Sequence, residues 1–361
     1  MQGYLAPRTT PVISGDMHLT AKMKICLVTR KFDLKTGGIG RISTELRDGL
    51  RKRGHEVITV STPREDLASY FLYTFLELHF KLPKGCDVYH AITPMESIWL
   101  PKEKSVATIL DLIPITNPKD SGTRMSTNSI TRSIGKSCFS IGCKAASRCK
   151  KVVSISNLVQ DGFEAHFGKR PRVIRLGINE DLEPRPKKNP RLRIGYLGQL
   201  IERKGVGLLI NSFMRSGLDA DLVLGGNGMD KEYFKALGKR DTRIKFPGFI
   251  PDEKLVDFYN SLDVFVFPTT IEGYGLPIVE AMACKIPVIV LSNSIIPKEV
   301  KNRCIVVDGL DYILGHRDYL EGLCKSVDIE GNYKWAKEHN WNKTVDEYIE
   351  VYKEVMNGKK A

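Results

Sequence analysis

The sequence lacks any hydrophobic run long enough to cross a membrane. A spanning helix needs roughly 18 to 20 consecutive apolar residues, and no stretch of the 361 residues approaches that length. The first 22 residues also lack the apolar core of a secretory signal peptide. We therefore expect a chain that does not span a membrane, with residues 1–22 as a flexible leader and Met17 or Met23 as alternative starts.

The eight cysteines form no CxxC pair and have no companion histidines at the spacing of a zinc site. This pattern excludes the common structural zinc motifs. Reduced thiols are the simpler interpretation, and they are typical of the cytoplasm. We expect a cytoplasmic protein without a zinc site.

Acidic residues are missing from residues 121–152, which form the most basic stretch of the chain. The formal net charge is +13, and residues 1–186 carry +11 of it, with 29 Lys and Arg against 18 Asp and Glu. Such a field attracts an anionic membrane surface, a phosphorylated acceptor or nucleic acid. The chain has neither a helix-turn-helix pattern nor aromatic residues interleaved with the cations, so nucleic acid is the weakest candidate. The seven cations are Arg124, Arg132, Lys136, Lys144, Arg148, Lys150 and Lys151.

What the chain does contain is two sets of short apolar strands that alternate with helical patterns. The first set lies at 24–29, 56–61, 88–91, 105–110 and 152–155. The second lies at 192–197, 220–225, 244–246, 264–267, 288–291 and 305–307. This alternation predicts an α/β fold with two doubly wound parallel sheets, separated by the proline-rich segment 184–190. We predict Rossmann-like domains over residues 23–183 and 184–343, followed by a C-terminal helix within residues 344–361.

Residues 272–280, with the sequence EGYGLPIVE, have the composition of a ligand-binding loop between a strand and a helix. A buried strand precedes the run, and Pro277 suits the first turn of a helix. Gly273 and Gly275 let the backbone turn tightly beside a ligand. The N–H groups of Tyr274, Gly275 and Leu276 would then face an anion at the helix start, and a diphosphate fits this place.

The two carboxylates of the run complete a binding site for a sugar nucleotide. Glu280, one turn inside the helix, can accept hydrogen bonds from the two vicinal hydroxyls of a ribose. Glu272, ahead of the glycines, would face the transferred sugar at the other end of the diphosphate. The run resembles the Glu-x7-Glu motif of the retaining glycosyltransferases with the GT-B fold.

The resemblance extends over about residues 23–356, through the motifs at 37–41, 198–200 and 203–205 and through Trp341 at the start of a closing helix. It implies two Rossmann-like domains that face an interdomain cleft, with the closing helix crossing back onto the first domain. It also implies transfer of a sugar, with retention, from a UDP- or GDP-linked donor to a hydroxyl acceptor, for which a lipid-linked or membrane glycan is one option. No metal and no cofactor are expected, because cations and helix-start amides can hold the diphosphate.

The expected site residues follow from the motifs and from the strand ends, where ligands bind in such sheets. Arg203 and Lys204 precede a helix and would neutralise the leaving diphosphate. Arg41, after the first glycine loop, and His90, at a strand end, are candidates on the acceptor side. The catalytic set is Glu272, Asp111, Lys204 and Arg203. The donor-binding set is Gly38, Gly40, Gly198, Gly226, Gly273, Tyr274, Gly275, Leu276 and Glu280.

Two positions depart from the family pattern. Leu110 stands where the family commonly has a histidine that touches the transferred sugar, and leucine forms no hydrogen bond. The neighbouring Asp111 is our candidate substitute. Gln199 stands where the family often has an arginine, and Arg203 is the candidate replacement. These departures leave an alternative open, a catalytically weak GT-B protein that acts as a sugar-nucleotide sensor or a partner subunit.

Residues 70–82, with the sequence YFLYTFLELHFKL, are apolar almost all round a helix. One core face requires fewer apolar residues than this. A helix buried against the sheet is one interpretation. Partial insertion at the inner face of the cell membrane, beside the basic residues 121–152, is the other.

Overall fold

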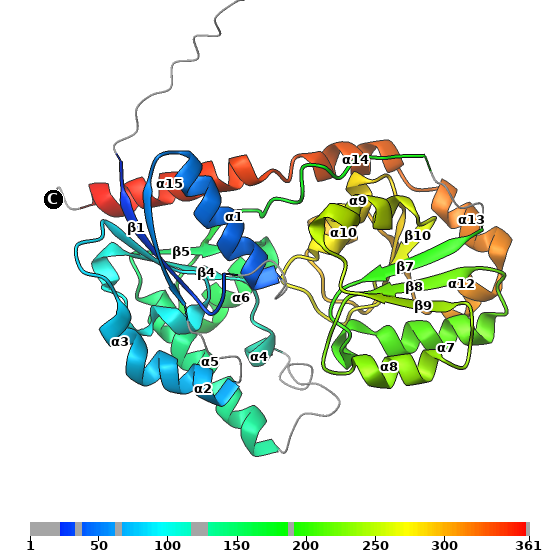
Figure 1. Ribbon diagram of the computed structural model, residues 1–361, viewed down its shortest axis with the longest axis horizontal. Coiled ribbons are helices and arrows are strands. Elements are labelled where there is room, and N and C mark those ends of the chain that lie inside the picture. Colours follow the sequence, from blue (N-terminus) through cyan, green and yellow to red (C-terminus); the bar gives the residue numbers. More distant parts are fainter. Residues whose placement is uncertain (1–21, 33–37, 62–66, 117–128, 187–190, 359–361) are drawn as a thin grey trace, which may run out of the picture.

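The computed structural model describes residues 22–32, 38–61, 67–116, 129–186 and 191–358 and consists of two α/β domains (Figure 1). Each domain has a six-stranded parallel sheet, with strand order β2-β1-β3-β4-β5-β6 in the first and β12-β11-β10-β7-β8-β9 in the second. The predicted fold class is confirmed. The leader, Gly37, Arg124, most of the proline-rich linker and the Arg132 side chain lie outside the described part.

The N-terminal domain contains β1 (Lys24–Thr29), α1 (Gly38–Lys52), β2 (Glu56–Ser61), α2 (Leu67–Leu72), the π-helical turn η2 (Tyr73–Glu77), α3 (Leu78–Lys81), β3 (Val88–Ala91), the 3₁₀ helices η3 (Pro94–Trp99) and η4 (Lys102–Lys104), β4 (Ser105–Ile109), α4 (Ile113–Thr116), α5 (Ser129–Ser147), β5 (Lys151–Ser154), α6 (Asn157–Phe167) and β6 (Arg172–Val173). The first five strands lie within one residue of their predicted bounds. β6 was not predicted, because two residues carry no alternation of apolar and polar positions.

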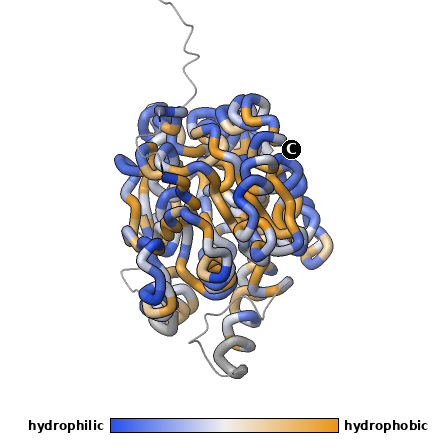
Figure 2. Tube along the Cα trace, turned by 90° about the vertical axis from the view of Figure 1, so that its right-hand side faces the viewer, coloured by the Kyte–Doolittle hydropathy of each residue, from blue (hydrophilic) through white to orange (hydrophobic). Residues whose placement is uncertain are grey.

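The C-terminal domain contains β7 (Arg193–Leu197), η5 (Glu202–Lys204), α7 (Val206–Ser216), β8 (Asp221–Gly225), α8 (Lys231–Gly238), β9 (Ile244–Gly248), α9 (Asp252–Asn260), β10 (Val264–Val266), α10 (Leu276–Ala283), β11 (Val288–Leu291), α11 (Lys298–Lys301), β12 (Ile305–Val307), α12 (Asp311–Gly315), α13 (Arg317–Lys325) and α14 (Ile329–Lys337), followed by α15 (Trp341–Asn357). β3, β4, β10 and β11 are buried at every position, as expected of central strands covered by helices on both faces. Figure 2 shows hydrophobic residues on inner segments of the chain and hydrophilic residues on many of the outer ones.

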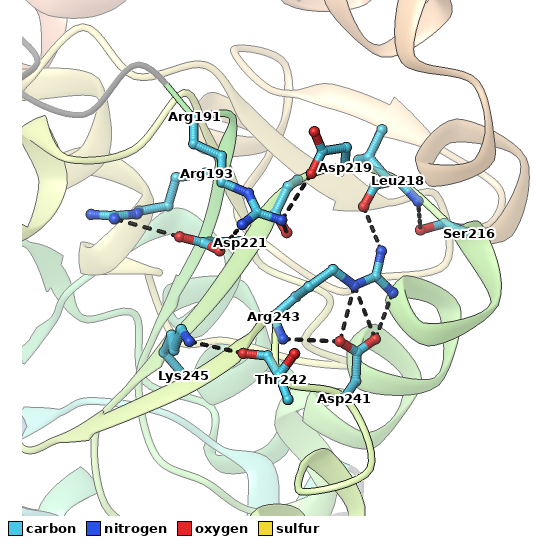
Figure 3. A network of polar contacts seen from close by, with 11 residues as sticks. Arg191, Arg193, Ser216, Leu218, Asp219, Asp221, Asp241, Thr242, Arg243 and Lys245 are labelled. Carbon is cyan, nitrogen blue, oxygen red and sulfur yellow. Dashed lines mark hydrogen bonds and ion pairs between the residues drawn. The ribbon is translucent and has the colours of Figure 1, made fainter.

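A polar network ties the amino ends of β7, β8 and β9 together (Figure 3). Arg193 contacts Asp221 at 3.6 Å, and Arg243 forms several hydrogen bonds to Asp241. The backbone N–H of Arg193 also donates to Asp263, 2.7 Å away, just before β10. These contacts fix the strand ends that face away from the other domain. The carboxyl ends of the strands point toward it.

Helix α15 follows the C-terminal domain in sequence but packs on the N-terminal domain, beside α1 (Figure 1). Its tyrosines reach into the first sheet. The His90 ring contacts the Tyr352 hydroxyl at 2.7 Å and Thr108 Oγ1 at 2.8 Å, and Thr108 contacts the Tyr348 hydroxyl at 3.0 Å. A buried polar cluster, as well as apolar packing, therefore holds α15 against the N-terminal domain.

We expect stability to decrease below about pH 6.5 because burial lowers the pKa of several histidines, and two of them, His90 and His339, are strongly shifted. Burial lowers the pKa of His90 from 6.5 to about 3 and that of His339 to about 4. The unfolded chain binds protons at these residues below pH 6.5 while the folded chain does not. Each histidine then removes up to about 1.4 kcal/mol of unfolding free energy per pH unit.

Denaturant unfolding between pH 7.5 and 4.5 measures this slope. A His90→Gln variant removes one of the two groups, so its slope between pH 6.5 and 5 should be shallower than that of the unmodified protein. Equal slopes for the two proteins would contradict the assignment.

Candidate active site between the two domains

Loops from both domains meet at the carboxyl ends of the strands. Gly273, after β10, lies against the loop after β4: a Cβ atom there would come within 2.1 Å of the Leu110 carbonyl oxygen. Ser156, which caps α6 after β5, donates a hydrogen bond from Oγ to the Gly273 carbonyl at 2.7 Å. No side chain fits at residue 273, so glycine is required here for close approach of the two domains.

A buried ion pair joins Lys204 to Glu272. Nζ of Lys204 contacts Oε1 of Glu272, and the Thr269 hydroxyl donates to the same oxygen at 2.7 Å. Lys204 is only 9% exposed. Burial lowers the pKa of Lys204, and the Glu272 carboxylate offsets part of that effect. The pair places a positive charge beside the first carboxylate of the motif.

The turn before α7 holds this cation in place. Gly205 has φ +70, and a Cβ atom there would lie 2.1 Å from the Pro268 carbonyl oxygen, so the turn packs directly against the end of β10. Thr270 N–H donates to the Arg203 carbonyl at 3.0 Å, and the Arg203 guanidinium donates to the Ile271 carbonyl at 2.7 Å. Arg203 and Lys204 are thereby fixed against the loop that carries Glu272.

Asp111 lies in a similar position on the N-terminal domain, just after the carboxyl end of a strand. It follows β4 and accepts a hydrogen bond from the Ile113 N–H at 3.1 Å. Burial raises the pKa of Asp111, and the Glu272 charge adds to this, whereas Arg203 and Lys204 act against it. The four residues expected to be catalytic therefore form one charge cluster where the two domains meet.

Glu280 lies one turn into α10, which begins after Gly275 in a left-handed conformation with φ +94. The carboxylate is almost completely covered, with 3% of the residue exposed. The Tyr259 hydroxyl donates to Oε2 at 2.8 Å, and Arg41 donates to Oε1 at 2.7 Å. Both carboxylate oxygens thus have protein partners.

Arg41, which the sequence offered as an acceptor-side candidate, contacts Glu280 of the C-terminal domain. Its guanidinium reaches from α1 to the C-terminal domain and forks between Glu280 on α10 and Asp252 on α9. Burial by itself lowers the pKa of Arg41, but the two carboxylates outweigh it and raise the value. Sequence reasoning missed Asp252 and Tyr259, because neither belongs to a motif and both reach the site only through the packing of α9.

His90 lies beneath α15, and the Tyr274 side chain lies against the segment that precedes this helix. His90 is fully buried beneath α15, and both of its ring nitrogens contact hydroxyls, which does not fit contact with an acceptor. The Tyr274 hydroxyl contacts His339 near the start of α15. Tyr274 can face a ligand in the cleft only through its backbone.

The glycine-containing loops after β7 and β8 contact each other through their backbones. Gly226 has φ +122, and a Cβ atom there would lie 1.9 Å from the Gly198 carbonyl oxygen, so the loops after β7 and β8 touch. Gly38 and Gly40 lie in the first turn of α1 rather than in a loop before it. Gly40 is buried, and the space around Gly38 is open.

The described residues contain neither a metal-binding cluster nor a membrane-spanning helix. No group of three or more His, Cys, Asp or Glu in this part of the chain is arranged to hold a metal ion. Among its helices, none combines the length and apolar character needed to span a bilayer.

Residues 178–310 match the family model of glycosyl transferases group 1. O-antigen chain mannosyltransferase B of Escherichia coli is 29% identical over 170 residues, which are 44% of this chain and 45% of that protein. An uncharacterized glycosyltransferase of Methanocaldococcus jannaschii is 30% identical over 241 residues, or 57% and 58% of the two chains. The chain thus matches about half the length of these curated relatives.

Solved structures resemble the whole chain. Sucrose-phosphate synthase from Thermosynechococcus elongatus has a TM-score of 0.74 at 16% identity, covering 93% of this chain and 100% of that one. HepE of Anabaena, in complex with UDP and glucose, has a TM-score of 0.65 at 17% identity, covering 91% and 98%. Two Rossmann-like domains that meet in this way define the GT-B class. Within that class, the match of residues 178–310 relates the C-terminal domain to the glycosyl transferases group 1.

Proposed function

We propose that this protein is a retaining glycosyltransferase that moves a sugar from a nucleoside diphosphate sugar to a hydroxyl acceptor. The observation that carries the proposal is the pairing of Lys204 with Glu272 at the glycine turn, one helix turn from the buried carboxylate of Glu280. Such a site supplies a cation and helix-start amides for the diphosphate and one carboxylate for each end of the donor.

In the reaction, the bond between the anomeric carbon and the diphosphate breaks and negative charge develops on the leaving oxygen. Lys204 and Arg203 stabilise that charge, which is the main electrostatic demand of the step. Their two positive charges support a metal-independent mechanism. The leaving phosphate takes the proton of the acceptor hydroxyl as the new bond forms on the same face of the sugar, and Glu272 and Asp111 orient the hydroxyls of the sugar.

The relatives support a glycan or another sugar as the acceptor and UDP or GDP as the leaving group. Their printed names include an O-antigen mannosyltransferase and a mannosylfructose-phosphate synthase, and HepE was solved with UDP. The alternative role, a sugar-nucleotide sensor with little turnover, is favoured by Leu110 in place of the family's histidine and Gln199 in place of its arginine.

Thermal unfolding with a panel of UDP and GDP sugars tests donor binding, since a bound donor raises stability by mass action. A turnover assay with the stabilising donor then separates enzyme from sensor. Stabilisation without hydrolysis or transfer would favour the sensor. Stabilisation by none of the donors would contradict both roles.

The acceptor side of the proposal includes docking on an anionic membrane. Leu72, Leu76 and Phe80 form an exposed stripe along α2, η2 and α3, with Phe80 84% exposed. The opposite side of the same segment is anchored, since the Tyr70 hydroxyl donates to the buried Glu96 at 2.7 Å. One side of residues 70–82 is therefore buried and the other is exposed. The exposed stripe supports the second sequence interpretation, partial insertion at a membrane surface.

Helix α5 brings cations to the same region, because it packs on η3, which packs on η2 (Figure 1). Lys136 and Lys144 are exposed on α5, together with Ile134 and Ile141, and Arg148 is exposed directly after the helix. A basic residue near an anionic surface contributes roughly 1 kcal/mol, so three of them and an apolar stripe suffice for reversible binding.

We expect the protein to sediment with vesicles in proportion to their anionic lipid content and to be released by high salt. Changing Lys136, Lys144 and Arg148 to Gln should abolish most of this binding, and Leu76→Ser with Phe80→Ser should weaken it at every salt concentration. The matched control changes three exposed lysines of the other domain, Lys239, Lys298 and Lys325, to Gln. Wild type that stays in the supernatant throughout would indicate an acceptor in solution.

A further inference from the structure

Arg41 binds the carboxylate of Glu280, the residue that the proposed function assigns to the ribose of the nucleotide. Its Nη1 lies 2.7 Å from Oε1 of Glu280, and Tyr259 donates to the other carboxylate oxygen. With only 3% of Glu280 exposed, almost no surface of this residue is left for the two hydroxyls of a ribose. Arg41 and the ribose would therefore use the same hydrogen-bonding surface.

The contact is built as an interdomain clamp rather than a chance surface pair. Arg41 comes from α1 of the first domain, and its fork reaches Glu280 on α10 and Asp252 on α9 of the second. The Arg41 side chain is only 16% exposed. A fork between two carboxylates with this degree of burial holds its geometry much better than an exposed single pair.

We propose that Arg41 competes with the nucleotide for Glu280, so that the Arg41 clamp must release before a ribose can bind. This inference rests on the proposed function, because it takes Glu280 as the ribose ligand. The protein would then exchange between a clamped arrangement and one that accepts the donor, and the apparent donor affinity would scale with the fraction of unclamped molecules.

The decisive variant is Arg41→Gln, because the clamp and simple electrostatics predict opposite results. Removing a cation near an anionic ligand weakens binding by ordinary Coulomb attraction. Removing a residue that competes with the nucleotide for Glu280 strengthens nucleotide binding. If about one molecule in five is unclamped, release of the clamp lowers the apparent Kd of UDP or GDP about fivefold.

Two further variants separate the clamp from general effects of charge and folding. Arg41→Lys keeps the charge but cannot fork between two carboxylates, so its Kd should fall between those of wild type and Arg41→Gln. Lys52→Gln removes an exposed cation at the far end of α1 and should not tighten binding. Thermal unfolding of each variant shows that it is folded under the conditions of the titration.

Calorimetric titration with UDP and with GDP measures the Kd of four proteins, which are wild type, Arg41→Gln, Arg41→Lys and Lys52→Gln. Tighter binding to Arg41→Gln than to wild type supports the clamp. Equal or weaker binding to Arg41→Gln, with wild type binding normally, overturns the clamp and leaves the proposed function intact; weaker binding would place Arg41 in contact with the donor instead. Failure of all variants to bind either nucleotide overturns the proposed function and the clamp with it.

Discussion

Replacing Lys204 with Ala should lower kcat by on the order of 10²-fold while substrate binding changes less. The physical reason is that Lys204 is only 9% exposed where the two domains meet, and a buried positive charge stabilises a developing anion far more than it would in water. A loss of this size corresponds to about 2.7 kcal/mol of transition-state stabilisation. Steady-state kinetics with the donor found in the thermal screen measures the change.

The Lys204 experiment needs a control for stability, since the variant leaves Glu272 without its cation. Lys204→Met keeps most of the side-chain volume and should lose the same activity as Lys204→Ala. Lys239→Ala, which removes an exposed cation at the end of α8, should leave kcat near wild type. Turnover near wild type in folded Lys204→Ala would remove the residue from leaving-group stabilisation.

Replacing Glu280 with Ala should weaken nucleotide binding by about 1–3 kcal/mol, roughly 5- to 150-fold, through lost hydrogen bonds to a charged acceptor. Loss of the Arg41 clamp in the same variant would act in the other direction, so the measured change is the net of the two. Calorimetry with the nucleoside diphosphate gives this net value.

A comparison of nucleotides isolates the ribose contact. Wild type should prefer UDP or GDP to the 2′-deoxy and 3′-deoxy forms, and Glu280→Ala should bind all three with similar affinity. Glu253→Ala, at an exposed carboxylate on α9, serves as the charge-matched control and should keep the preference. A Glu280→Ala protein that still discriminates between ribose and deoxyribose would show that another residue holds the diol.

Much of the fold could be predicted from the sequence because its strands are central strands of parallel sheets. Segments such as β10 and β11 are buried at every position, and each is a continuous apolar run. The exceptions were elements with little sequence signal. The two-residue edge strand β6 and the π-helical turn at Tyr73–Glu77 depend on neighbours rather than on their own periodicity.

The sequence by itself also determined the local parts of the candidate site. Gly275, Pro277 and Glu280 lie in one turn and one helix, so their spacing fixes their relative positions before any tertiary contact forms. Lys204 and Glu272 are 68 residues apart, yet both follow strands of one parallel sheet, and the carboxyl ends of such strands share an edge. Local geometry and strand order were sufficient to predict that these residues lie close together.

Only the tertiary structure decided which partners the side chains have across the cleft. Arg41 and Glu280 are 239 residues apart and belong to different domains, and His90 and Tyr352 are 262 apart. Their contacts depend on how the two domains pack and on where α15 crosses back. Propensity and periodicity describe one element at a time, so they carry no information about such packing. For this reason the sequence placed Arg41 and His90 on the acceptor side, whereas the fold puts one on Glu280 and the other beneath α15.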